Sequence, residues 1–231
     1  MRPNVVNTPN DAIGHSDHMK IYNYFRSGTS HRLRIVLNLK GLDWDYVAVD
    51  LRAVAHFETA FKALNPQGFV PVLIDGDLVL TQSPAIIEWL EERYPNPPLL
   101  PADMNDRARV RALAALVGCD IHPLNNRRVL EYLRHTLGCD EAAVLAWCAT
   151  WISTGFAALE AMLVTNADRG NFCFGGWPGI ADAYLVAQVE SARRFKVDLS
   201  PYPCICAIDL ACAALPAFIA AAPRQQPDAL S

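Results

Sequence analysis

The sequence lacks several features that assign proteins to large functional classes. Its 231 residues contain no two cysteines spaced as C-x-x-C, and its seven cysteines are an odd number. This count argues against a disulfide framework or a structural zinc site, and it predicts reduced, mostly buried thiols in a cytoplasmic protein. No apolar run reaches the roughly 18–20 residues of a membrane span, so we expect no contact with a membrane.

A strong charge of one sign is lacking as well. The chain has 20 basic and 24 acidic side chains, and its net charge is −4. Such a balance gives no support for a nucleic-acid partner. Hydrophobic residues make up 52% of the chain, which allows a substantial core in one large or two small domains. Residues 1–18 are polar, and we expect them to form a disordered tail.

Residues 19–98 carry the pattern of a small α/β domain. Short apolar runs that predict strands alternate with segments of helical spacing, in the order βαβαββα. Asp75-Gly76-Asp77 supplies the turn of a hairpin, and Ser83, followed by Pro84, is expected to cap a helix. Prolines at four positions between residues 95 and 101 then predict a linker.

Residues 103–231 carry helical spacing, so we expect an all-helical second domain whose last residues, from about Pro223 onward, are frayed. One helix start lacks its usual cap. Gly179 stands three residues before Asp182, where a serine would complete a capping box. We expect Asp182 still to accept the backbone N–H of Gly179, and a Gly179→Ser substitution to raise the melting temperature.

The segment from Tyr24 to Arg34 joins the first strand to the first helix. Its turn holds the hydroxyls of Ser27 and Thr29, and arginines stand on both sides of it. Free backbone N–H groups at a helix N-terminus attract anions and favour a thiolate over a thiol, while arginines bind carboxylates. The segment is equally consistent with an ordinary turn that precedes a helix with a solvated basic face.

Five motifs give the chain a family resemblance. The first domain contains YFRSGTSHRLRIVLNLKG, FKALNPQGFVPVL and QSPAIIEWLEERYP, and the second contains GCDIHPLNNRR and ESARRFKVDLSPYP. From about residue 19 onward the sequence resembles the zeta class of glutathione transferases, and within it most of all the bacterial glutathione-dependent maleylpyruvate isomerases. The resemblance implies the glutathione transferase fold, with a thioredoxin-like N-terminal domain and an all-helical C-terminal domain, in a cytoplasmic homodimer.

The resemblance implies that glutathione binds across the strand ends of the first domain. In this fold the proline of Val70-Pro71 is cis, and the backbone before it pairs with glutathione like an added strand. The residues assigned to glutathione in this way are His56, Val70, Pro71, Gln82, Ser83, His122, Asn126 and Arg127. Each also has a structural alternative: a proline that begins a strand, a serine that caps a helix, a histidine in a surface loop, or a solvated arginine pair.

The reactive turn departs from the family pattern. Zeta-class sequences usually read Ser-Ser-Cys where this chain reads Ser27-Gly28-Thr29. The reactive sulfur is therefore expected to belong to glutathione. The resemblance places Thr29 nearest to this sulfur, with Ser27 as the rival, and either hydroxyl would hold it by a hydrogen bond. Arg26 and Arg194 are expected to bind the carboxylates of a small diketo-acid substrate. Thr29, Ser27, Arg26 and Arg194 are thus the predicted catalytic residues, and no residue is assigned to a metal.

The activity that the resemblance implies is a cis–trans isomerisation, from maleylpyruvate to fumarylpyruvate in gentisate breakdown. The glutathione thiolate adds to the cis double bond, the resulting single bond rotates, and the thiolate leaves, so that glutathione acts as a cofactor. Three alternatives stay open. They are a maleylacetoacetate isomerase of tyrosine breakdown, a glutathione-conjugating transferase, and a non-catalytic binding protein of the same fold.

Overall fold

The structure, a computed structural model, describes residues 18–230. The tail expected over residues 1–18 lies outside this range except for its last residue. The first part of the chain follows the predicted order of strands and helices. Its elements are β1 (Lys20–Asn23), α1 (Gly28–Leu39), β2 (Asp45–Ala48), η1 (Ala55–Phe57), α2 (Thr59–Leu64), β3 (Val72–Asp75), β4 (Leu78–Thr81) and α3 (Ser83–Arg93).

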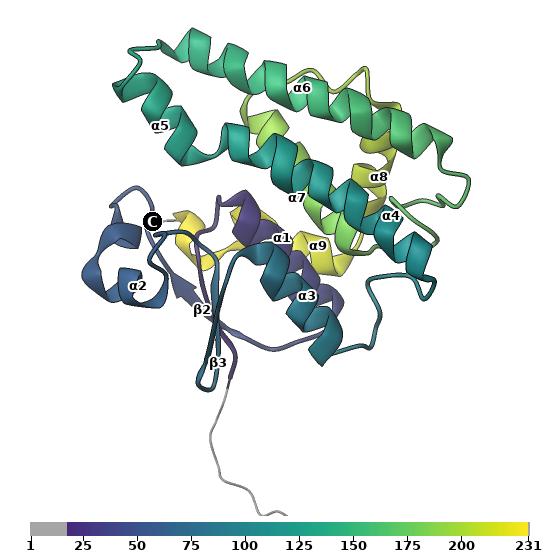
Figure 1. Cartoon of the computed structure of the whole chain (residues 1–231), viewed down its shortest axis with the longest axis horizontal. Coiled ribbons are helices and arrows are strands. Elements are labelled where there is room, and N and C mark those ends of the chain that lie inside the picture. The colour runs from purple at the N-terminus through teal and green to yellow at the C-terminus, as the bar shows by residue number, and fades with distance from the viewer. Residues whose placement is uncertain (1–17, 231) are drawn as a thin grey trace, which may run out of the picture.

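The four strands form one mixed sheet in the order β2-β1-β3-β4. β1 runs parallel to β2 and antiparallel to β3, and β3 pairs with β4 in the predicted hairpin. Ile21 in β1 is completely buried while its neighbour Lys20 is exposed, as the two-residue period of a strand requires. Figure 1 shows α1 and α3 packed together beside the sheet, with α2 apart from that pair.

The expected cap of α3 is wrong. Ser83 is the first residue of the helix, and Gln82 holds the cap position without a side-chain hydrogen bond. The chain turns at Gln82, where φ is 67°, so it enters the helix too early for the Ser83 hydroxyl to reach the first-turn amides. That hydroxyl accepts a hydrogen bond from Nε of Arg32 at 3.0 Å instead.

The second part of the described chain is helical, as predicted. The exact boundaries at residues 98 and 103 stay predictions. Its elements are α4 (Met104–Ala115), η2 (Leu116–Ile121), η3 (His122–Asn125), α5 (Arg127–His135), α6 (Glu141–Thr165), α7 (Ile180–Arg194), α8 (Pro203–Ala213), α9 (Pro216–Ala221), η4 (Pro223–Gln225) and η5 (Pro227–Leu230). Helices α7 and α9 pack on α1, which joins the two parts of the fold (Figure 1).

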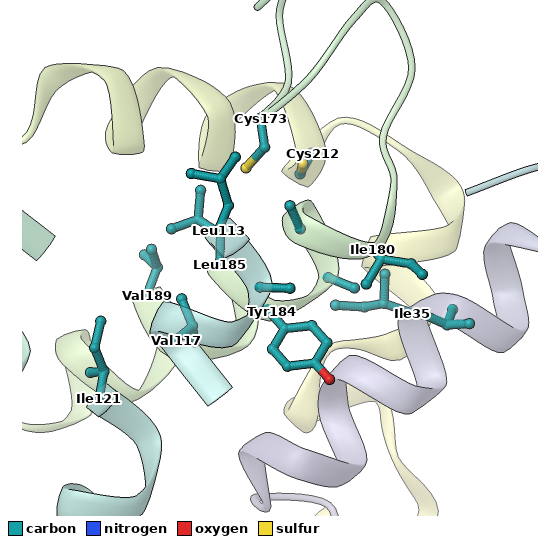
Figure 2. Packing of buried hydrophobic residues seen from close by; sticks show 14 of the residues in the cluster. Ile35, Leu113, Val117, Ile121, Cys173, Ile180, Tyr184, Leu185, Val189 and Cys212 are labelled. Atoms are coloured by element: carbon teal, nitrogen blue, oxygen red, sulfur yellow. The ribbon is translucent and has the colours of Figure 1, made fainter. Parts of the chain in front are cut away.

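One hydrophobic core runs through both parts of the chain. Helix α7 lies at its centre and is buried over most of its length. Figure 2 shows Leu185 and Val189 of α7 beside Leu113 and Val117, with Ile35 of α1 near the Tyr184 ring. Because the core residues of α1 and α7 belong to one cluster, the sheet and the helical part are held at a fixed distance from each other.

A buried ion pair fixes the linker between the two parts. Nζ of Lys40 lies 2.7 Å from Oε2 of Glu91, and their side chains are 0% and 5% exposed. The Lys40 ammonium also donates to the carbonyl oxygens of Tyr94 and Pro97, and the Glu91 carboxylate accepts the backbone N–H of Leu99. The linker backbone is therefore held by two side chains that belong to the first part of the fold.

The expectation for Gly179 is half right. Asp182 accepts the Gly179 N–H at 2.8 Å, as expected. A Cβ atom at Gly179, however, would lie 2.6 Å from the carbonyl oxygen of Leu99 in the linker. The expected gain from Gly179→Ser is therefore wrong, because the linker backbone passes too close to admit any side chain.

Two other expectations need correction. The segment from Pro223 onward is not frayed, since it forms η4 and η5 and its Asp228 accepts the backbone N–H of Phe25 at 3.0 Å. The cysteines are less uniformly buried than expected, with three buried, three half-buried and Cys119 exposed.

Helix α6 bears on the expectation that no apolar run is long enough to span a membrane. With 25 residues it is long and apolar enough to cross a membrane, judged by length and composition alone. Only 28% of its most apolar 18-residue window is buried, and the buried residues of α6 all belong to the common core except Glu160. Glu160 accepts backbone N–H groups of Cys204 and Ile205 at the start of α8, which gives α6 a polar anchor within the fold.

Candidate functional site

A cavity of about 540 Å³ lies between the two parts of the fold. Its first wall comes from the turn before α1, the loop around η1, the start of β3 and the start of α3. Its second wall comes from η2, η3 and the start of α5. The lining residues include all of the predicted glutathione residues and both hydroxyl residues: Ser27, Thr29, His56, Val70, Pro71, Gln82, Ser83, His122, Asn126 and Arg127.

The two hydroxyls form a directed chain of hydrogen bonds. Thr29 donates to the carbonyl oxygen of Val70 at 2.8 Å, and the oxygens of Ser27 and Thr29 lie 2.8 Å apart. A carbonyl oxygen only accepts, so the single Thr29 proton is committed to Val70, and the Ser27 proton must point at Thr29. Ser27 is also the cap of α1, because its oxygen accepts the Ser30 N–H at 3.3 Å.

The strand wall has the expected backbone geometry. The Val70-Pro71 peptide bond is cis, as the family resemblance implied. Val70 is buried and its carbonyl oxygen accepts the Thr29 hydroxyl. Beside it, the side-chain amide of Gln82 donates to Gln67 at 2.5 Å, which leaves Gln82 at the cavity edge with its amide group already oriented.

Arg32 is a site-supporting residue that sequence reasoning did not single out. It is 4% exposed, its Nε donates to the Ser83 hydroxyl at 3.0 Å, and its guanidinium lies 4.2 Å from the centre of the Tyr184 ring. Burial lowers the pKa of this guanidinium, yet an arginine stays charged at neutral pH. It therefore places a positive charge directly behind the N-terminus of α3.

The helical wall is built from an irregular stretch of backbone. After α4 the chain makes the π-helical turn η2 and the 3-10 turn η3, which contains Pro123. This is the kink that the proline predicted. Asn126 ends the irregular stretch as the cap of α5, where its side chain accepts the Arg128 N–H at 3.2 Å. The side chain of Arg127 crosses to the first part of the fold and donates to the Leu51 carbonyl oxygen.

Two cavity histidines are held in the neutral form. Burial, followed by the charges of Arg32 and Arg194, lowers the pKa of His122 to about 3. Burial and the charge of Arg127 lower the pKa of His56 as well. Nε2 of His122 and Nδ1 of His56 are buried without a hydrogen-bond partner in the described structure. Such unpaired polar atoms are costly unless a bound group or water satisfies them.

Arg26 and Arg194 lie together at the turn but do not line the cavity. Nη1 of Arg194 donates to the backbone carbonyl oxygen of Arg26 at 3.2 Å. The neighbouring Arg193 points away and pairs with Asp209 of α8, so one of the two adjacent arginines faces the turn, as their helical positions predicted. Burial, followed by the charge of Arg26, lowers the pKa of Arg194.

The charges around the cavity are unbalanced. Arg127 and Arg128 line it and Arg32 lies behind Ser83, while Glu131 is its one acidic lining residue in the described structure. Among residues 18–230 no three His, Cys, Asp or Glu side chains gather as metal ligands. The cavity therefore suits an elongated anion that brings hydrogen-bond acceptors to both walls.

Comparison with known proteins assigns the family. Residues 26–93 match the model of the glutathione S-transferase N-terminal domain. The chain is 66% identical over 210 residues to a maleylpyruvate isomerase from a Ralstonia species, which covers 91% of this chain and 99% of that protein. A solved maleylpyruvate isomerase, described as a bacterial glutathione S-transferase in the zeta class, matches with a TM-score of 0.89 at 66% identity over 90% of this chain and 99% of its own. This chain belongs to the zeta class of glutathione transferases.

A second solved relative contains two bound ligands. A maleylacetoacetate isomerase from Methylobacterium extorquens AM1, solved with bound malonate and GSH, matches with a TM-score of 0.87 at 40% identity, over 90% of this chain and 98% of its own. The thioredoxin-like and helical domains expected from the sequence are thus the two domains of the glutathione transferase fold.

The glycine at position 28, where zeta-class sequences usually have a serine, has a structural reason. A Cβ atom at Gly28 would lie 3.2 Å from Cε1 of His122, which is tighter than ordinary van der Waals contact. The glycine therefore lets the His122 ring pack directly on the first turn of α1. A serine in its place would require the His122 ring to shift by a few tenths of an ångström.

Proposed function

We propose that this chain is a glutathione-dependent cis–trans isomerase that converts maleylpyruvate to fumarylpyruvate. The observation that carries the proposal is the pairing of Arg26 and Arg194 beside the hydroxyl turn, joined by the hydrogen bond from Arg194 to the Arg26 carbonyl oxygen. Two neighbouring cations can each bind one carboxylate of a dicarboxylate substrate, and each charged hydrogen bond contributes about 1.5–3 kcal/mol.

The cavity residues fit glutathione. The cis Val70-Pro71 backbone and the N-terminus of α3, with Arg32 behind it, offer donors and acceptors to a peptide-like anion. On the other wall, the unpaired Nε2 of His122 is a buried polar atom that a ligand would satisfy. Bound glutathione would supply a thiol nucleophile that adds reversibly to the cis double bond and so permits its rotation.

We propose that Ser27, rather than Thr29, gives its hydroxyl proton to the sulfur. The Thr29 proton is committed to Val70, whereas the Ser27 proton rests on the Thr29 oxygen. Rotation of the Ser27 hydroxyl costs one neutral hydrogen bond and keeps the cap, because the same oxygen goes on accepting the Ser30 N–H. Thr29 then acts by fixing the Val70 backbone.

The two arginines have separable roles in this proposal. Arg26 belongs to the turn and lies next to Ser27, so it is suited to the carboxylate nearer the double bond. Arg194 approaches from α7 and supports the same turn through its hydrogen bond. Neither lines the cavity assigned to glutathione, so their proposed role concerns the substrate and not glutathione.

The test is a glutathione-dependent absorbance assay with maleylpyruvate, maleylacetoacetate and chlorodinitrobenzene. We expect maleylpyruvate to be isomerised most efficiently. Arg26→Ala should reduce its kcat/KM by about 10- to 100-fold, the equivalent of one charged hydrogen bond, with glutathione affinity changed less than twofold. Equal losses of turnover and glutathione binding would contradict the role of Arg26.

The assay also separates the alternatives. A preference for maleylacetoacetate would make the chain a maleylacetoacetate isomerase, and activity with chlorodinitrobenzene alone would make it a conjugating transferase. Glutathione binding without turnover would identify a binding protein. The cytoplasmic location and the homodimer stay predictions from the family resemblance, and light scattering of the purified protein tests the second of them.

A further inference from the structure

The C-terminal end of the chain returns to the turn that carries Arg26. Asp228 in η5 accepts the backbone N–H of Phe25 on one carboxylate oxygen at 3.0 Å and the hydroxyl of Tyr46 on the other. The hydrogen bond to Phe25 spans 203 positions of sequence. Figure 1 shows the last described residues, in yellow, beside the first domain. Asp228 is not among the residues that line the cavity.

The backbone of Phe25 is held from both sides by opposite charges. Its N–H is bound by Asp228, and its carbonyl oxygen accepts a hydrogen bond from Nη2 of Arg34 at 2.9 Å. Arg34 is completely buried, and its Nε donates to the carbonyl oxygen of Ala221 at the end of α9. The C-terminal segment thus reaches this one residue twice, through Asp228 directly and through Arg34.

The ring of Phe25 in turn supports Arg26. The guanidinium carbon of Arg26 lies 6.0 Å from the centre of the Phe25 ring, and that ring packs edge-on against Tyr24 at 4.7 Å between centres. A cation at this distance from an aromatic face is weakly attracted to it. The orientation of the Phe25 backbone positions the Phe25 ring, and the ring in turn determines where the Arg26 guanidinium lies.

We propose that Asp228 is a positioning residue for the substrate carboxylate, which it serves by fixing Phe25 and through it Arg26. This inference rests on the proposed function of Arg26. It assigns a role in the reaction to a C-terminal segment that does not touch the glutathione cavity.

The hydroxyl turn has anchors of its own. The Ser27 N–H donates to the carbonyl oxygen of Tyr24 at 3.0 Å, and the Ser27 oxygen accepts the Ser30 N–H. Loss of Asp228 should therefore loosen the Phe25 ring and the Arg26 side chain beside it, while Arg34 and Arg194 keep the Phe25 and Arg26 carbonyl oxygens bound and the thiol site stays in place. The expected result is weaker binding of dicarboxylates at unchanged glutathione affinity, since a mobile guanidinium must be ordered on binding.

The experiment compares the full chain with Asp228→Ala, Asp228→Asn and Tyr46→Phe. The control variant is Asp198→Ala, because Asp198 is an aspartate of the α7–α8 connection that likewise accepts a backbone N–H, that of Ser200 at 2.9 Å. Calorimetry measures the Kd of malonate in the presence of glutathione, the Kd of glutathione alone, and kinetics give KM for maleylpyruvate.

We expect Asp228→Ala to raise the Kd of malonate and the KM of the diketo acid at least fivefold, with the glutathione Kd changed less than twofold. Asp228→Asn and Tyr46→Phe should have smaller effects in the same direction, because each leaves an acceptor for the Phe25 N–H. Asp198→Ala should match the unsubstituted chain. In an Arg26→Ala background, the further substitution of Asp228 should leave the malonate Kd unchanged.

Three results would overturn the inference: an unchanged malonate Kd in folded Asp228→Ala, an equal weakening of glutathione and malonate, or a full-sized further loss in the Arg26→Ala background. If Asp228→Ala does not fold, Asp228→Asn must weaken malonate at least twofold at constant glutathione affinity, and otherwise the inference fails. A chain that isomerises no diketo acid but shows the malonate pattern would refute the proposed function and leave the positioning role intact.

Discussion

The buried pair of Lys40 and Glu91 gives the sharpest test of how the two domains are joined. We consider Lys40→Met, which keeps an unbranched side chain one atom shorter than lysine and removes its charge. The Glu91 carboxylate would then remain buried with the backbone N–H groups of Leu99 and Leu100 as its partners. Breaking a buried ion pair from one side costs about 3–5 kcal/mol, because the remaining charge is uncompensated.

A matched pair whose glutamate lies on α3, the helix of Glu91, serves as the control. Arg111 and Glu88 are also 2.7 Å apart, but their side chains are 41% and 36% exposed. Water solvates the remaining partner there, so Arg111→Met should cost at most about 1 kcal/mol. The difference between the two variants thus isolates the effect of burial at constant distance.

The measurement is urea-induced unfolding followed by circular dichroism, with the melting temperature as a second readout. For a chain of this size, Lys40→Met should lower the melting temperature by about 6–20 °C. The double variant Lys40→Met with Glu91→Gln should be more stable than the sum of the two single losses, by about 0.5–3 kcal/mol. Equal losses in Lys40→Met and Arg111→Met, or strict additivity, would refute the reasoning.

Three further predictions follow from single contacts. Gly179→Ser should lower the free energy of unfolding by about 1–3 kcal/mol, since its Cβ would lie 2.6 Å from a linker carbonyl oxygen, and a higher melting temperature would contradict this. Ser27→Ala should raise the thiol pKa of bound glutathione by about one unit, as measured by thiolate absorbance. Thr29→Val should raise this pKa less. Equal shifts in the two variants would contradict the different roles of the two hydroxyls. Burial lowers the pKa of both His31 and His122 to about 3, so the unfolded chain binds more protons below pH 6.5, and stability is lost as the pH falls from about 6.5 towards 3. Between pH 7 and pH 5, each histidine should account for a loss of about 2 kcal/mol in the free energy of unfolding. His31→Gln should abolish the part of this loss that is due to His31, as measured by urea unfolding at the two pH values. An unchanged pH dependence in this variant would show that His31 is charged or exposed.

The order of the elements could be predicted from the sequence because each depends on local pattern. Alternating and helical spacing, the Asp75-Gly76-Asp77 turn and the proline-rich linker are all short-range signals. The cavity lining followed from the family motifs, and the structure brings those residues together from both domains. That these lining residues bind glutathione stays a proposal.

Two of the errors concern contacts between distant segments. The Gly179 expectation considered the helix start alone, whereas the Leu99 carbonyl that forbids a side chain there belongs to a segment 80 positions earlier. The C-terminal segment was expected to be frayed because it ends the chain, while its order comes from Asp228 bound to Phe25 and Tyr46. No local pattern contains such information, because the partners meet through the tertiary fold.

The basic residues of α1 show most clearly what the sequence left open, since a solvated basic face was one interpretation of them. Arg32 and Arg34 are 4% and 0% exposed, and Lys40 follows at the end of the helix with a fully buried side chain. Each reaches a different segment: Arg32 the start of α3, Arg34 the Phe25 backbone and α9, and Lys40 the linker. A buried cation must be compensated by oriented acceptors, so these three side chains specify where their partners lie. The helix whose first turn carries the proposed thiol site is thereby also the element that fixes both domains around it, and a substitution at any of the three should disturb the site from a distance.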